Sequence, residues 1–383
     1  MKKYLLTTLV IMTVWVLPAA AQWQFTLSTD QSYDTNPFRY AEALASYVAS
    51  ADVGLQYSGQ DLAVSYTGSY NFFEAYNARN YYWHQLALFH EYKNGEWGAF
   101  VNQRINDPEY NIYDYATFSL YSTYMYRAAG MNYRWYNQLA YDSYNQLSEL
   151  NNINFYSGLR VNRSFESGMS VIANGGFTYK QYVKDVTTTG TLNPSVQDGG
   201  HWGRGGMGDD NMGFHENSNF SAPSVTKVDW SLRLAHALWE KAGLAVIYKG
   251  NYNLSSRSRN VIGLSYSNES LIYDDPTGYN AQSIGTELTW ILPLGITWKS
   301  GYYYADKTYI AQGVYSVDDS YNEAIGRRDF RHNAWSYLSK RIAVGANAAI
   351  TPTLRFRWLD NQSNSYYYDY QTTSISLGLN WEF

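Results

Sequence analysis

The sequence predicts an all-β protein, a transmembrane antiparallel up-and-down β-barrel of about 16 strands, and three observations support this fold class. Apolar and polar residues alternate along segments of about ten residues. Short and long linkers alternate between those segments. Aromatic residues make up 18% of the chain and charged residues 16%, whereas soluble domains carry roughly 25% charged residues. Because tyrosine and tryptophan prefer the boundary between hydrocarbon and water, this composition favours a surface that meets a membrane.

The first segment predicts export from the cytoplasm. Lys2 and Lys3 precede an apolar stretch over residues 4–17, and the small residues Ala19 to Ala21 follow. A basic head, an apolar middle and a small-residue cleavage site make up a secretory signal peptide. The apolar stretch is short for a membrane anchor. We therefore expect residues 1–21 to form a signal peptide and residues 22–383 to form the barrel.

Composition also bears on chemistry. The chain has no cysteine, so a disulfide framework, a thiolate metal site and lipidation of a cysteine at the cleavage site are excluded. The formal net charge is only -5, which makes nucleic acid a poor partner. The sequence predicts no cofactor and no metal.

The alternation of apolar and polar residues is clearest over residues 41–57. The odd positions hold alanine, tyrosine, valine and leucine, and the even positions include Glu42, Ser46, Asp52 and Gln56. The pattern recurs over 62–72, 152–162, 228–238, 244–254 and 354–358. After the signal segment no apolar run is longer than the five residues 244–248, whereas a transmembrane helix needs about 20. Backbone that crosses a bilayer without helices must form a closed barrel.

A soluble sandwich or solenoid also alternates, but the polar positions carry little charge and the linker lengths favour a barrel. Outer-membrane barrels have short periplasmic turns and longer external loops. Counting strands this way gives 16 if residues 243–273 are one strand plus a loop, and 18 if 255–258 is a loop and 267–269 a turn. We favour 16 within a range of 14–18. The short linkers are 58–60, 93–96, 128–130, 166–168, 240–242 and Pro293, and the longer ones are 34–39, 74–80, 107–112, 143–151, 184–224 and 307–329.

The last eleven residues carry a resemblance. Ile375, Leu377, Leu379, Trp381 and Phe383 alternate with polar or small residues, and the sequence stops on Phe383. This segment resembles the C-terminal signal of Gram-negative outer-membrane β-barrel proteins of the porin-like class, without pointing to one family within it. The resemblance implies insertion by the barrel assembly machinery, with Leu379, Trp381 and Phe383 as the assembly signal, and a place among outer-membrane lipid and lipopolysaccharide. We expect a barrel without a plug, closed by pairing of this strand with one that begins near Trp23.

If the apolar positions face lipid, the alternate charged positions face the interior. A charge on the lipid face near mid-membrane costs about 2–4 kcal/mol. Such residues could line an aqueous pore, or they could pair across the interior and fill it. A barrel of 16 strands should be wide enough for water. The predicted pore-lining residues are Glu42, Asp52, Arg160, Arg233, Lys249, Glu287, Lys299, Arg355 and Arg357.

The linker 184–224 is much longer than the others and holds eight glycines. Long loops are often functional, so it could narrow the barrel from inside or bind a ligand outside. It could also be a plain surface loop, since it is rich in glycine. Its residues His201, Asp209, Asp210 and His215 match no ordered metal motif.

Three histidines and three aromatic triplets are the remaining candidates for catalysis or ligand binding. His84 and His90 share one strand face and His236 lies among apolar positions, but no G-x-S-x-G stretch occurs, and we predict that the chain is not an enzyme. Three aromatic triplets, 81–83, 302–304 and 366–368, lie beside predicted external loops. They could stack on sugar rings, but an aromatic girdle at the membrane interface explains their positions better.

Three functions follow as hypotheses. The first is a porin-like passive channel for small polar solutes. The second is a non-conducting surface or assembly barrel that acts through its external loops or a partner, and the third is a barrel hydrolase. The sequence favours the first because the predicted interior is wide, polar and charged. It does not specify the solute or the oligomeric state.

Overall fold

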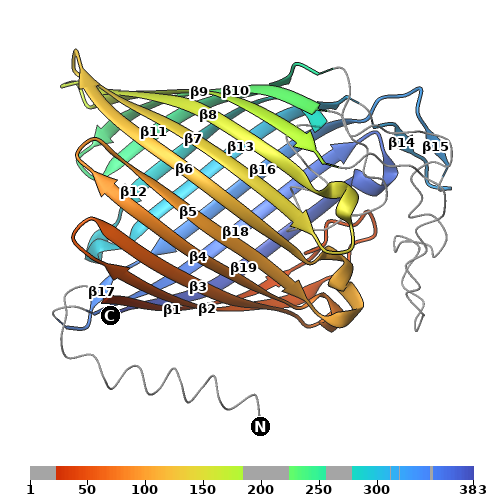
Figure 1. Ribbon diagram of the computed structural model, residues 1–383, viewed down its shortest axis with the longest axis horizontal. Coiled ribbons are helices and arrows are strands. Elements are labelled where there is room, and N and C mark those ends of the chain that lie inside the picture. The colour runs from red at the N-terminus through yellow and green to blue at the C-terminus, as the bar shows by residue number, and fades with distance from the viewer. Residues whose placement is uncertain (1–22, 184–223, 256–277, 311, 319, 346–347) are drawn as a thin grey trace, which may run out of the picture.

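The computed structural model describes residues 23–183, 224–255, 278–310, 312–318, 320–345 and 348–383. These residues form a closed barrel of 16 antiparallel strands, drawn in Figure 1. The first strand pairs with both the second and the last. The predicted fold class and the preferred count of 16 are confirmed. The predicted signal peptide 1–21 and nearly all of the linker 184–224 lie outside the described residues.

The wall strands have 12 to 16 residues, more than the about 9–11 that cross the hydrocarbon of a membrane, and they run obliquely around the barrel (Figure 1). They are β1 (Trp23–Asp34), β2 (Ser46–Ser58), β3 (Leu62–Phe73), β4 (Tyr81–Tyr92), β5 (Gly95–Asn106), β6 (Tyr115–Ala128), β7 (Met131–Tyr144), β8 (Asn152–Ser164), β9 (Met169–Tyr182), β10 (Ser224–Trp239), β11 (Ala242–Asn253), β12 (Tyr279–Ile291), β13 (Thr297–Tyr309), β16 (Arg328–Ser339), β18 (Ala349–Ser363) and β19 (Tyr370–Glu382).

Shorter elements lie in the linkers. The short strand β17 (Ile342–Ala343) pairs with β18, and β14 (Val314–Tyr315) pairs with β15 (Tyr321–Asn322) in the long linker between β13 and β16. In the described part of the chain, the helices are all too short and too polar to span a membrane. Short 3-10 helices also lie in the linkers, and they are η1 (Asn77–Arg79), η2 (Pro108–Tyr113), η3 (Ser148–Leu150), η5 (Pro293–Gly295) and η6 (Tyr366–Tyr368).

The two faces of the wall differ in chemistry, as the alternation predicts. One face exposes large apolar side chains, such as Leu120 at 61% and Leu377 at 64% of their surface. By register, the charged residues on this face of the described strands are Arg163, Asp306, Arg328 and Asp360, all near strand ends. An apolar band with charges only at its margins is the lipid-facing surface of a membrane barrel.

The other face is concave, because its side chains meet across an intervening strand. Arg233 on β10 reaches Glu287 on β12, and Arg355 on β18 reaches Asp30 on β1. Side chains on the outside of a barrel diverge and would not make such contacts. The polar face is therefore the interior, and a one-residue shift of any strand would turn its polar side chains toward lipid.

The ends of the barrel differ as the linker lengths predict. The shorter turns join strands at the end that holds the C-terminus, and the longer linkers gather at the opposite end (Figure 1). We call the latter the external end. Ala129 and Gly130, between β6 and β7, both have positive φ, at 50° and 73°. Two successive positive φ angles give a type I′ turn, which matches the twist of the flanking strands.

Aromatic residues form a band on the lipid-facing side of the short-turn end. The ring of Trp290 lies 5.9 Å from that of Trp239 and 6.1 Å from that of Trp298. The rings of Trp23 and Tyr57 lie 4.9 Å apart. Tryptophan and tyrosine at this position bury an apolar ring body while the polar N–H or O–H remains at the water boundary. An aromatic girdle is therefore present at the short-turn end. Of the triplets from which the sequence predicted a girdle, 81–83 and 366–368 lie beside the external linkers, and 302–304 lies in the middle of β13.

One predicted strand begins late. The alternation suggested a strand from Ala41, but β2 begins at Ser46. The side chain of Asn36 bonds the backbone of Tyr40 in both directions, at 2.7 and 3.0 Å, and Phe38 is buried against Phe73. These local bonds compete with the strand ladder. Glu42 therefore lies in an external linker and not in the wall, and its place among the predicted wall residues was wrong.

The last residue extends the seam that closes the barrel. The backbone N–H of Phe383 donates to Phe25 at 2.9 Å, and the N–H of Phe25 donates to Phe383 at 3.2 Å. The ring of Phe383 lies 5.5 Å from that of Phe25 and 4.8 Å from that of Trp381. The final aromatic residue thus completes both the seam between β1 and β19 and the aromatic band.

Deletion of Phe383 should sharply reduce the amount of folded barrel in the outer membrane, because it removes both seam hydrogen bonds and the ring contacts. The measurement is the heat-modifiable fraction on gels of outer-membrane extracts. Phe383→Tyr is the matched control and should assemble like the natural chain. Equal assembly of the deletion variant and the control would contradict this role.

Candidate pore lining and external mouth

The structure places eight of the nine predicted wall charges on the interior face. Strand register and alternation put these eight on the same face as the ion pairs of Arg233 with Glu287 and of Arg355 with Asp30, which mark the interior. The exception is Glu42, whose Oε1 accepts a hydrogen bond from Tyr366 Oη at 3.2 Å in the external linkers. The eight are Asp52, Arg160, Arg233, Lys249, Glu287, Lys299, Arg355 and Arg357.

One group of these charges lies on β10 to β13, and its members contact one another or a shared tyrosine. Arg233 forms an ion pair with Glu287, and the hydroxyl of Tyr303 donates to the other oxygen of the same carboxylate. The ammonium of Lys249 lies 5.0 Å from the centroid of the Tyr303 ring. The side chains of Arg233 and Glu287 remain 32% and 25% exposed, so the pair is a partly solvated feature of the wall.

A second group lies on β18, β1 and β2. Arg355 Nη1 is 3.1 Å from Asp30 Oδ2, and Ser28 Oγ donates to Asp52 Oδ2 at 2.8 Å. Arg357 Nε donates to Asn333 Oδ1 at 3.4 Å. Among the described residues, Arg160 and Lys299 make no ion pair. The interior charges are therefore partly paired along the wall, and others are left for solvent or a solute.

Sequence reasoning missed the aromatic residues of the interior. Phe100, Tyr121, Tyr136 and Tyr156 come from four successive strands, β5 to β8, and their ring centroids are 6.2, 6.2 and 5.9 Å apart in that order. We call these four residues the aromatic ladder. The signal was present in the sequence, since each of them occupies a position of the polar alternation. A girdle at the membrane interface was the expected place for aromatic residues, and none of these four was among the predicted pore-lining residues.

Glycines beside the interior rings allow them to lie against the wall. A Cβ added at Gly98 would come 2.7 Å from the ring of Tyr121, and one added at Gly158 would come 2.5 Å from Tyr156 Oη. The same holds for Gly285 under Tyr303 and for Gly301 under Trp335. A ring that covers a glycine on the neighbouring strand shields its backbone and projects less into the interior than a ring displaced by a side chain.

At the external end, buried cations lie against tyrosine rings. Arg104 Cζ is 3.8 Å from the centroid of Tyr81, and Lys307 Nζ is 4.3 Å from that of Tyr279. Arg79 Cζ is 4.1 Å from the centroid of Tyr110. All three cations are buried. A desolvated cation over an aromatic face gains about 2 kcal/mol, so these contacts offset part of the cost of burying charge at the mouth of the barrel.

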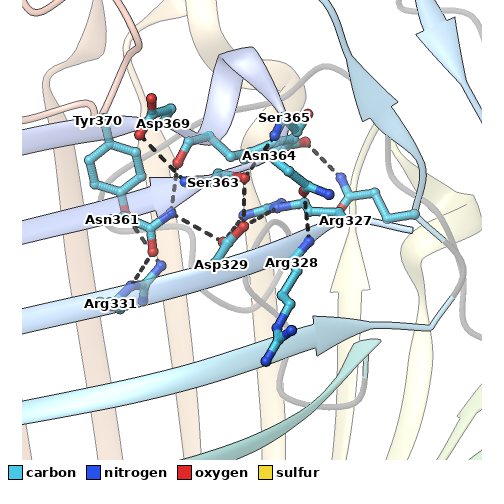
Figure 2. Close-up of polar contacts among 12 residues, drawn as sticks. Arg327, Arg328, Asp329, Arg331, Asn361, Ser363, Asn364, Ser365, Asp369 and Tyr370 are labelled. Atoms are coloured by element: carbon cyan, nitrogen blue, oxygen red, sulfur yellow. Dashed lines mark hydrogen bonds and ion pairs between the residues drawn. The ribbon is translucent and has the colours of Figure 1, made fainter. Parts of the chain in front are cut away.

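The most deeply buried of these cations is Arg327, shown in Figure 2. It is 2% exposed and lies between the rings of Tyr309 and Tyr368, with Cζ 3.9 and 3.3 Å from their centroids. Its Nε donates to Asp329 Oδ1 at 2.9 Å, and its Nη1 donates to Gln312 Oε1 at 2.9 Å. Burial alone would lower the pKa of Arg327, but the facing tyrosines and Asp329 raise it above the usual value.

The carboxylate of Asp329 is fully buried, and its partners come from β18 and from the linker before β16 (Figure 2). Besides Arg327, it accepts hydrogen bonds from Ser363 Oγ at 2.7 Å and from Asn361 Nδ2 at 3.1 Å. Asn361 also donates to the backbone oxygen of Tyr368 at 2.6 Å. Because every buried charge here has close partners, this network anchors the linker before β16 and η6 to the barrel wall.

The three aromatic triplets do not all belong to a girdle. Tyr82, Tyr302 and Tyr304 lie on the lipid-facing side by register, but Tyr81 and Tyr303 face the interior. The third triplet forms η6, in which Tyr368 is buried under Arg327. The girdle interpretation was wrong for these inward and buried residues, because strand alternation places neighbouring residues on opposite faces.

Histidines of the described strands lie on the lipid-facing side. His84 Nδ1 and Tyr66 Oη are 2.9 Å apart, and the rings of His90 and Trp97 are 5.7 Å apart. His236 faces the same side by register. Within the described ranges no three His, Asp or Glu side chains are grouped as metal ligands. The four residues 201, 209, 210 and 215 considered for a metal lie outside those ranges.

The fold is similar to that of solved outer-membrane structures, and part of the sequence matches a protein-family model. A family model described as surface lipoprotein assembly modifier matches residues 251–383, which include β12 to β19. No curated protein sequence matches the chain significantly. The solved structure of Acinetobacter baumannii OccAB1 has a TM-score of 0.55 and 12% identity, and the match covers 94% of this chain and 96% of that chain.

Two further solved structures are similar. Pseudomonas aeruginosa OccD3 (OpdP) has a TM-score of 0.52 and 10% identity over 95% of this chain and 92% of that chain. Acinetobacter baumannii OccAB3 has a TM-score of 0.51 and 8% identity over 94% and 98%. At such identities the likeness concerns the fold. The protein has the closed 16-stranded barrel of outer-membrane porins, and its last strands resemble a family named for surface lipoprotein assembly.

Arg327→Met should loosen the linker between β13 and β16, because it leaves the buried carboxylate of Asp329 without its cation. Removing one partner of a buried pair costs about 3–5 kcal/mol. The measurement is cleavage of the folded barrel by an added protease, with the cut site located by mass spectrometry. Arg328→Met is the matched control, since Arg328 is half-exposed and pairs with Asp306 on the lipid-facing side. Equal protection of both variants would contradict the anchoring role.

Proposed function

We propose that the protein is a passive outer-membrane channel for small polar solutes, exported by a signal peptide cleaved after Ala21. The observation that carries the proposal is the chemistry of the interior face. Taken over the 16 strands together, serine, threonine, asparagine, glycine and charged residues occupy most interior positions, although the interior face of β4 is mainly aromatic or apolar. An aqueous path can be lined by such side chains, and a barrel of 16 strands is wider than its own side chains fill.

The interior charges favour anions. Along the strands, basic interior positions outnumber acidic ones, although the whole chain has a net charge of -5. Four of these side chains, Arg104, Lys180, Lys307 and Asp329, are buried, so the excess of positive charge that meets solvent is small. An excess of one sign on a pore wall raises the local concentration of the opposite ion. The basic positions are Arg104, Arg127, Arg134, Arg160, Lys180, Lys227, Arg233, Lys249, Lys299, Lys307, Arg331, Arg355 and Arg357, and the acidic ones are Asp30, Asp34, Asp52, Glu91, Glu96, Asp142, Asp229, Glu287, Asp329 and Glu382.

The purified barrel, reconstituted into a planar lipid bilayer, should give stepwise conductance with a reversal potential that favours anions in a salt gradient. Absence of steps above those of a mock preparation would remove the channel proposal. Replacing Arg355 and Arg357 by glutamine should shift the reversal potential toward cations, because Asp30 loses its partner and the wall loses positive charge. Arg163→Gln, at a lipid-facing position, is the control and should leave the potential unchanged.

The export proposal has its own measurement. Mature protein purified from the outer membrane should begin at Gln22, as determined by N-terminal sequencing or intact mass, because the small residues up to Ala21 fit a signal peptidase site. A mature chain that retains residues 1–21 would contradict it. We also propose that the barrel assembly machinery inserts the chain and that lipopolysaccharide surrounds its external half.

A second candidate function is a barrel that assists the assembly of surface lipoproteins. The match of residues 251–383 to the surface lipoprotein assembly modifier model supports it. Deleting the gene should then reduce the amount of a lipoprotein at the cell surface, measured by protease shaving of intact cells, while total lipoprotein stays constant. An unchanged surface lipoprotein profile together with clear channel conductance would favour the first function.

A further inference from the structure

The aromatic ladder on β5 to β8 is a continuous apolar track on a polar wall. These strands lie side by side in the sheet (Figure 1). The four rings are all partly exposed, and each lies within 6.2 Å of the next. A buried stack would contribute to a core, but a partly exposed stack on the interior face leaves ring surface in contact with solvent. Such a surface can bind a solute that has flat apolar faces.

Glycines leave space for two rings of the ladder, Tyr121 and Tyr156, to lie close to the wall. Tyr156 occupies the space beside both Gly158 and Gly176, where an added Cβ would lie 2.5 Å from its hydroxyl oxygen. Tyr121 occupies the corresponding space beside Gly98. Alanine or a larger residue at these glycines would displace the rings. Two of the four rings therefore lie where the wall has no side chain beneath them.

Hydrogen-bonding groups border the ladder. Tyr136 Oη donates to Gln138 Oε1 at 2.8 Å, and Gln138 Nε2 donates to Ser119 Oγ at 3.1 Å. Glu96 and Asp229 lie in the cross-strand row that contains Tyr136, and Asp229 also lies 3.6 Å from Lys227. The border thus offers both donors and acceptors, and its charges have both signs.

Two arginines next to the ladder face each other in register. Arg134 on β7 is directly opposite Arg160 on β8, and both are exposed. Like charges at opposed positions destabilise a sheet, and among the described residues neither guanidinium has a carboxylate within ion-pairing distance. Each guanidinium carries five N–H donors. These donors are available to a solute that lies along the rings.

We propose that the interior wall of β5 to β8 binds a linear oligosaccharide, whose pyranose rings stack on Phe100, Tyr121, Tyr136 and Tyr156. This inference rests on the proposed channel and names its solute class. The apolar C–H faces of successive sugar rings cover successive aromatic rings. The hydroxyls, each both donor and acceptor, bond the bordering amide, carboxylate and guanidinium groups. A single small ring would use one step of the ladder, whereas a chain of rings uses its full length.

The charges bordering the ladder favour a neutral sugar chain. Arg134, Arg160 and Lys227 stand against Glu96 and Asp229, so an acidic chain would gain from some groups and be repelled by others. Neutral hydroxyls can bond all of them. The ladder should therefore bind a neutral chain such as maltohexaose better than an acidic chain of the same length.

The test uses the folded full-length barrel in detergent, titrated by calorimetry with maltohexaose, glucose and hexagalacturonate. Maltohexaose should bind more tightly than the other two. The triple variant Tyr121→Leu, Tyr136→Leu and Tyr156→Leu should weaken maltohexaose binding by about tenfold or more, which equals about 1.4 kcal/mol. The triple Tyr→Phe variant at the same positions keeps the rings and should bind within about threefold of the natural chain.

Tyr337→Leu is the matched control. Tyr337 is an interior aromatic residue on β16, away from the ladder, and should be replaceable without loss of binding. Heat-modifiability on gels confirms that each variant is folded. Unchanged binding in the leucine triple, or tighter binding of hexagalacturonate than of maltohexaose, would overturn the inference.

Single-channel recording separates this inference from the channel proposal. If the barrel conducts and maltohexaose neither binds nor interrupts the current, the oligosaccharide site is wrong and the channel stands. If the barrel does not conduct but binds maltohexaose through the ladder, the channel proposal fails and the site stands. If both are correct, maltohexaose should block the current in the natural chain and in Tyr337→Leu, with much shorter blocks in the leucine triple.

Discussion

The seam between β1 and β19 is the constraint on which the rest of this structure depends. Backbone N–H and C=O groups cannot remain unpaired in hydrocarbon, so a sheet that crosses a membrane must have no edge. Here Phe25 and Phe383 exchange backbone hydrogen bonds, and nine residue pairs of β1 and β19 are in register. Once the sheet is closed, its curvature sends one set of alternating side chains outward to lipid and gathers the other set inside.

The interior combines two kinds of surface that a soluble core would not combine. Charged groups such as Arg233 and Glu287 pair along the wall and stay partly solvated, which avoids the desolvation cost of full burial. Aromatic rings lie over glycines and so take little of the cross-section. A wall built this way is compatible with an open aqueous path, and it offers a solute both ring faces and hydrogen bonds.

At the external end, buried polar contacts fix the linkers to the barrel wall. Arg327 and Asp329 are buried there, and the network around them satisfies both charges with groups from β16, β18 and two linkers. Burial raises the pKa of Tyr368, so this ring stays neutral beside Arg327. A fully partnered buried network fixes one arrangement, because any other leaves a charge unpaired in a poorly solvated place.

The sequence by itself determined the barrel and the interior position of charges such as Asp52 and Arg355, because strand periodicity assigns faces without knowledge of partners. It favoured 16 strands within a range of 14–18, and the structure decided the count. The sequence placed Glu42 wrongly, since the hydrogen bonds of Asn36 and the packing of Phe38 delay the start of the strand to Ser46. Only the tertiary structure decided which residues meet across strands. The ladder joins four successive strands and the Arg327 network joins two linkers to β16 and β18, and no local pattern encodes which residues lie opposite one another.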